Sequence, residues 1–115
     1  MKIENFSFED GYIRGILIHQ SSIEVQFELW NGSKVKVTFI DYVALKDFHS
    51  TDSETSELLC LEDTPLRQEL VKDTLSGGGT LDEIKDIKSF SFISSWGDRT
   101  LLEILATDIK FLNIE

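Results

Sequence analysis

The feature that most constrains this chain is the alternation of apolar and polar residues over positions 22–40. Apolar side chains recur at every second position on both sides of Asn31-Gly32, and residues such as Glu24 and Lys36 stand between them. A period of two is typical of a β-strand with one face buried and one face in solvent. Asn-Gly is a strong turn signal between two such strands. The segment therefore predicts an antiparallel hairpin.

The register of this hairpin follows from the requirement that residues opposite each other share a face of the sheet. Matching the apolar faces places Leu29 opposite Val35 and Phe27 opposite Val37. The connection then holds three residues, 31–33, or a two-residue turn followed by a bulge.

A second hairpin is predicted near the C-terminus, around Gly97-Asp98. The same matching pairs Phe92 with Ile104 and leaves a connection over 97–99. The alternation loses its parity at Thr107-Asp108, which indicates a bulge or bend that redirects the last strand. An edge position or a sharp curl of that strand is expected.

The remaining segments predict one more strand and a helical region. Residues 12–19 are typical of a central strand that forms a meander with the first hairpin. Thr64-Pro65 combines an N-cap residue with a proline at the first helical position, and the apolar spacing that follows predicts a helix over 65–75. Thr80 with Glu83 fits a capping box for a shorter helical segment.

Together these elements predict an α+β fold in a single domain, 1–115. The expected architecture is a curved antiparallel sheet of five or six strands, including two hairpins. One or two helices from residues 65–88 are expected to pack on one side of it.

The charge balance restricts the partners of the chain. The formal net charge is −10 in 115 residues, which disfavours nucleic acid and anionic membranes because both are bound through Lys and Arg. Seven of the carboxylates lie in the segment 41–63, where Lys46 is the only cation. Such a segment is typical of a solvated loop face, and its field would also speed association with a basic protein.

Cysteine content and hydropathy indicate a cytoplasmic protein. Cys60 is the only cysteine, so no disulfide can form within the chain, and a reducing compartment is adequate. Its apolar neighbours favour a small buried side chain over a reactive thiol. No apolar run reaches the ~20 residues that span a bilayer.

No group of residues has the spacing of a known catalytic or cofactor site. Asp47, His49 and Asp52 could bind a metal ion, but an acidic loop with a surface histidine explains them more simply. Gly77–Gly79 follows a helix and lacks the Lys of a phosphate-binding loop, so it is interpreted as a hinge. The sequence therefore predicts no enzyme, no metal site and no cofactor.

Trp30 and Trp96 each stand directly before a hairpin turn. A structural role in capping the end of the core is the first interpretation for both. The alternative is that one of them anchors a protein partner.

Three stretches of the sequence carry a resemblance to known proteins: Phe8-Glu9-Asp10, Leu29-Trp30-Asn31-Gly32 and the run from Leu102 to Ala106. With the acidic middle segment, they resemble small uncharacterised bacterial domains, some of which are similar to the immunity proteins of polymorphic toxins. The resemblance implies a protein partner and assigns no functional residue.

The sequence hypothesis is a non-enzymatic acidic protein-binding module, an immunity or inhibitor protein for a basic toxin. The alternative is a structural or regulatory module that homodimerises through an edge strand, for which the final strand is the candidate. The residues expected to contact the basic protein partner are Asp47, Asp52, Glu54, Glu57 and Trp30.

Overall fold

The computed structural model describes residues 7–113 and contains one eight-stranded sheet in the order β4-β7-β6-β5-β1-β2-β3-β8. Every pairing between these strands is antiparallel. An α+β fold with an antiparallel sheet is thus confirmed, but the predicted five or six strands were too few. The elements are β1 (Gly11–Ile18), β2 (Ser22–Glu28), β3 (Lys34–Ile40), β4 (Ala44–Asp47), β5 (Glu54–Leu61), α1 (Pro65–Ser76), the 3-10 helix η1 (Leu81–Ile84), β6 (Lys88–Ser94), β7 (Thr100–Ala106) and β8 (Asp108–Asn113).

Two of the strands lie in the acidic segment 41–63, which the sequence suggested was a loop. β4 has only four residues, and β5 carries the continuous run Leu58–Leu61 instead of an alternation. Neither has the period-two signal that reveals a strand. β5 lies inside the sheet between β6 and β1, and Cys60 on it is half-buried rather than fully buried.

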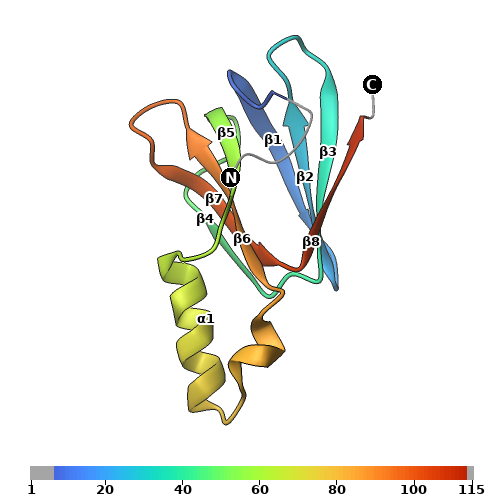
Figure 1. Ribbon diagram of the computed structural model, residues 1–115. Coiled ribbons are helices and arrows are strands. Elements are labelled where there is room, and N and C mark those ends of the chain that lie inside the picture. Colours follow the sequence, from blue (N-terminus) through green and yellow to red (C-terminus); the bar gives the residue numbers. More distant parts are fainter. Residues whose placement is uncertain (1–6, 114–115) are drawn as a thin grey trace.

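The sheet consists of two four-stranded halves that face each other across the core (Figure 1). The ring centroids of Phe39 on β3 and Phe90 on β6 are 5.5 Å apart, and those of Phe27 on β2 and Phe92 on β6 are 6.0 Å apart. These strands are not neighbours in the sheet, so the rings meet across the space between the halves. Phe8, which is 4% exposed, fills the same space.

The halves are joined at two places. At one, β1 pairs with β5 only through Gly11 and Tyr12. At the other, two segments cross together from one half into the other. The segment 34–47 contains β3 and β4, and the segment 102–113 contains most of β7 and all of β8. β3 pairs with β8 in one half, and β4 pairs with β7 in the other. The bend predicted near Thr107 is confirmed there, where the Thr107 amide donates to the carbonyl of Ile40. The predicted edge position of the last strand is also confirmed, because β8 ends the sheet order.

The registers predicted for both hairpins were wrong by two residues, although the faces were right. The observed pairs are Phe27 with Val35 and Phe90 with Ile104. In the first hairpin the Leu29 amide donates to the Ser33 carbonyl, and Gly32 has a φ of 88°. Three-residue loops place their left-handed residue last, so the loop is 30–32 rather than 31–33.

The helical region begins as predicted but covers less of the sheet. The Thr64 hydroxyl accepts from the Arg67 amide as an N-cap, and α1 continues to Ser76. No α1 residue is buried. Its apolar residues belong to a small cluster with Ile84, Ile87 and two sheet residues, Leu105 and Ala44, at the end of the molecule (Figure 1). The second predicted helix is the single 3-10 turn η1, so the helices cover one end of a half and not its whole face.

A buried carboxylate connects α1 to the sheet. Glu103 on β7 is 7% exposed and accepts hydrogen bonds from the hydroxyls of Thr64 and Ser89. Buried charged groups are stable only when they are hydrogen-bonded, so these two donors allow Glu103 to lie under the start of the helix. In residues 7–113 no helix is long and apolar enough to cross a bilayer.

Candidate interaction site

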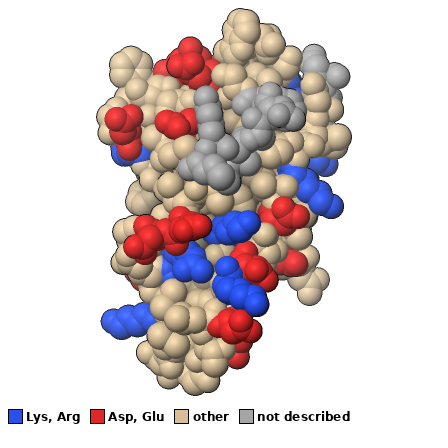
Figure 2. Space-filling view, viewed as in Figure 1, with Lys and Arg blue, Asp and Glu red and all other residues tan. Residues whose placement is uncertain are grey.

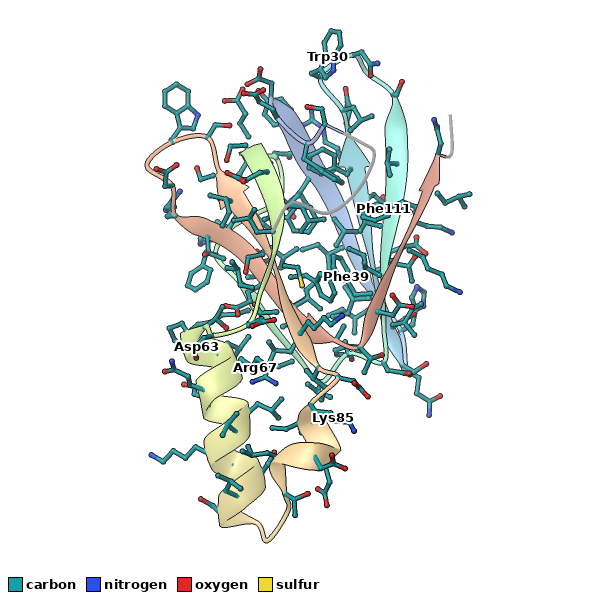
Figure 3. The ribbon with its side chains drawn as sticks, viewed as in Figure 1. Trp30, Phe39, Asp63, Arg67, Lys85 and Phe111 are labelled. Carbon is teal, nitrogen blue, oxygen red and sulfur yellow. The ribbon has the colours of Figure 1, made fainter. Side chains whose placement is uncertain are left out.

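A row of neighbouring residues crosses the sheet where the two hairpin connections project. Lys34 pairs with Glu28, Glu28 with Tyr12, and Tyr12 with Glu54. The row continues just past the end of β6, where the Ser95 amide donates to the Glu54 carbonyl. Trp30 and Trp96 stand just beyond this row. We call the row and the connections 29–33 and 95–99 the tryptophan end; Figure 3 labels Trp30 there.

Both tryptophans are solvent-exposed, Trp30 to 68% and Trp96 to 75%. The first interpretation, that they cap the core, was therefore wrong. The Trp96 backbone amide donates to the Ser94 hydroxyl at 2.9 Å. Large exposed aromatic side chains are enriched among the residues that dominate binding energy at protein interfaces.

Arg14 organises the charges beside this row. Its guanidinium donates to Glu28 at 3.0 Å and to Asp52 at 2.8 Å, and it lies 4.6 Å from the centroid of the Tyr12 ring. The hydrogen bonds to Asp52 and then Glu28 raise the pKa of Arg14 above its ordinary value, so it stays charged at physiological pH. One guanidinium is shared by both carboxylates, so Asp52 has an ion-pair partner within the molecule while the three side chains together keep a charge of −1.

Two hollows lie at the tryptophan end. One, of about 460 Å³, is lined by Arg14, Lys34 and the strand β2 between them. The other, of about 320 Å³, lies beside the second hairpin. Its lining combines two aromatic rings, three charged residues, two serines and one leucine: Tyr12, Trp96, Asp52, Glu54, Arg99, Ser53, Ser94 and Leu101.

The structure brings only part of the predicted site together. Asp52, Glu54 and Trp30 lie at or near the tryptophan end. Asp47 lies on the edge strand β4, opposite Leu102, where its carboxylate accepts from the Ser50 amide at 2.9 Å. Glu57 lies farther along β5, opposite Ile93. The acidic segment is therefore distributed over the molecule and does not form one face.

Sequence reasoning did not identify Tyr12, Arg14 or Arg99 as site residues. Tyr12 and Arg14 belong to a strand that was assigned to the core, and Arg99 belongs to a turn. The one usable signal was Trp96, whose position before a hairpin turn matches that of Trp30.

A third hollow, of about 550 Å³, lies at the opposite end of the molecule, between α1, η1 and the start of β6. Arg67 anchors it by donating to the carbonyls of Ile87 and Ile84 at 2.9 and 3.3 Å. Its rim carries both signs of charge, including Asp63 and Lys85, which Figure 3 shows far from Trp30. Figure 2 shows blue side chains gathered in this lower part of the molecule, with red ones beside them. The mixed rim does not favour a particular ligand.

Metal-ligating residues do not gather in the described part of the chain. Within residues 7–113, no group of three or more His, Cys, Asp or Glu side chains could hold a metal ion. Asp47 and Asp52 are instead engaged with the Ser50 amide and Arg14.

No protein-family model matches the chain, and neither the curated proteins nor the solved structures contain a match.

Proposed function

We propose that this chain is a non-enzymatic protein-binding module that acts in the bacterial cytoplasm as an immunity or inhibitor protein for a basic toxin. The partner contacts the tryptophan end. The observation that supports this proposal is the pair of exposed tryptophans, Trp30 and Trp96. They belong to the connections 29–33 and 95–99, which lie at the same end of the two halves (Figure 1). Exposed aromatic anchors flanked by polar groups are typical of the centre of a protein interface.

The charge of the molecule supports a basic partner. The net charge is −10, and a field of this sign increases the association rate of a positively charged protein. Glu54 has no ion pair within residues 7–113, so its charge is available to a partner, whereas Asp52 is paired with Arg14. Asp47 and Glu57 lie outside the contact surface and contribute to the long-range field.

The experiment is capture of partners by the immobilised full chain from lysates of its source cells, at low and high salt, followed by mass spectrometry. We expect a basic protein whose capture weakens as salt rises. With that protein purified, the double variant Trp30→Ala/Trp96→Ala should bind about thirtyfold more weakly, the effect of losing about 2 kcal/mol of interface energy.

The control variant is Leu75→Ala. Leu75 is also a large exposed apolar residue, at 51%, but it lies on α1 at the opposite end of the molecule (Figure 1). It should leave the affinity unchanged. An acidic partner, or equal binding by the double variant and the parent chain, would refute the proposal.

A second proposal is that the chain homodimerises through β8, its final strand. Its support is the edge position of β8 and the 53% exposure of Leu112 on that strand. Sedimentation at micromolar concentration tests it: a dimer that Leu112→Asp dissociates is expected, and a monomeric parent chain would exclude it.

A further inference from the structure

The hollow beside the second hairpin combines an unpaired carboxylate with aromatic walls. Glu54 lies at the start of β5, and its backbone is held on both sides by Tyr12 and by the Ser95 amide. The fully buried Leu101 contributes to the lining. Since these contacts use the backbone of Glu54, its carboxylate is not required for the pairing of the strands.

The walls of the hollow are suited to a cation. Tyr12 already carries the guanidinium of Arg14 at 4.6 Å from its ring centroid, and the exposed ring of Trp96 lines the other part of the hollow. Aromatic faces attract cations through their quadrupole, and tryptophan does so most strongly. A carboxylate beside such rings adds a charge-assisted hydrogen bond.

The hollow also contains a cation of the chain itself. Arg99 lines it, yet within residues 7–113 its side chain forms no ion pair with Glu54 or Asp52. The backbone carbonyl of Arg99 accepts from the Ser94 amide. This hydrogen bond holds the hairpin backbone and does not involve the Arg99 side chain. Glu54 therefore has no ion-pair partner within residues 7–113, and its carboxylate remains able to pair with a further cation.

We infer that this hollow binds an arginine side chain of the partner, with Glu54 as its counter-charge and Tyr12 and Trp96 as its walls. Arginine fits better than lysine because its planar guanidinium stacks on a ring and forms two parallel hydrogen bonds to a carboxylate. The inference deepens the proposed function and rests on it only for the identity of the partner, since the pocket chemistry can be tested without the partner.

The experiment is titration of the full chain with N-acetyl-argininamide, followed by NMR at the indole N–H signals of Trp96 and Trp30. We expect a saturable shift of the Trp96 signal at millimolar probe, with Trp30 unaffected. N-acetyl-lysinamide should bind more weakly, and the uncharged N-acetyl-norleucinamide should not bind.

The variant Glu54→Gln should weaken binding of the arginine probe about tenfold, as expected for loss of a charge-assisted hydrogen bond. The matched control is Glu57→Gln on the same strand. It removes the same charge outside the hollow, so the affinity for the arginine probe should change little. The NMR spectrum of the backbone amides verifies that each variant is folded. Absence of a Trp96 shift, or equal weakening by both variants, would overturn the inference.

The two proposals fail in different ways. If the captured basic partner requires the tryptophans but binds Glu54→Gln as tightly as the parent chain, the arginine pocket is wrong and the proposed function stands. If the arginine probe binds as described and the captured partner is acidic, the proposed function is wrong and the pocket stands.

Discussion

Trp30 and Phe27 lie three residues apart, yet Phe27 is 1% exposed and Trp30 is 68% exposed. The difference arises from the turn. Phe27 belongs to the inward-facing set of β2, while Trp30 is the first residue of a loop that leaves the sheet. An error of two residues in the register was enough to place Trp30 in the strand instead of the loop.

A single glycine shows how closely the start of β1 approaches the core. At Gly11 an added Cβ would lie 2.8 Å from the carbonyl oxygen of Glu28 and closer still to the ring of Phe27. Because Phe27 is buried among other rings, its ring cannot move aside to make space for the added Cβ. Gly11 is therefore needed for the contact between β1, β2 and the core.

We expect Gly11→Ala to lower the free energy of unfolding by about 1–3 kcal/mol through overpacking. Gly15→Ala is the control, because its Cβ would meet only the end of the flexible Gln26 side chain, at 2.9 Å. Urea denaturation measures both. Equal stability of the two variants would contradict the packing described for Gly11.

At the scale of elements, β1 has two different edges. One is paired with β2 along the whole strand, and the other pairs with β5 only at Gly11 and Tyr12. Ile18 is consequently 60% exposed, although Ile23 opposite it is fully buried. The sequence placed this strand correctly in the centre of the sheet but could not show that its second neighbour diverges.

The hydrogen-bonding pattern of β1 can be tested with proline. The His19 amide donates to the Ser22 carbonyl, and hydrogen-bonded pairs alternate in an antiparallel ladder. The Ile18 amide therefore points away from β2, whereas the Leu17 amide points toward it. Proline is tolerated in a strand only where the amide is not needed by the ladder.

We expect Ile18→Pro to change the free energy of unfolding by about 1 kcal/mol or less. Leu17→Pro removes a ladder hydrogen bond and should lower it by about 1–3 kcal/mol more than Ile18→Pro does. Both are measured by urea denaturation. Should Ile18→Pro be the more damaging change, the register of β1 and β2 would be wrong.

At the scale of the whole molecule, two halves of the sheet share one aromatic core. The contact between Phe39 and Phe90 joins residues on strands that are not paired with each other. Helix α1 does not contribute to this core, since its apolar residues pack in a separate cluster with Ile84, Ile87, Leu105 and Ala44. The stability of the domain therefore depends on the two halves meeting.

A double-mutant cycle measures that contact. Phe39→Leu and Phe90→Leu should show a coupling free energy of about 0.5–1.5 kcal/mol, the range for an aromatic pair. Phe39→Leu combined with Leu101→Val should be additive, because Leu101 is buried outside the aromatic core cluster. Additivity in the first cycle would show that the halves do not pack through these rings.

The sequence by itself determined the features that depend on neighbours along the chain. The alternation around Asn31-Gly32 specified a hairpin and its buried face, and Thr64-Pro65 specified the start of α1, because period and capping are local properties. It did not reveal β4 or β5, since a strand without alternation is recognised only by what it pairs with.

Only the tertiary structure decided which charges are available. Asp52 and Glu54 are two residues apart, looked equivalent and line the same hollow, but Asp52 is bound by Arg14, which is 38 positions away, whereas Glu54 has no ion pair within residues 7–113. Such contacts depend on how the two halves meet and on where each hairpin turns. Electrostatic pairing follows distance in space, which a local pattern does not contain.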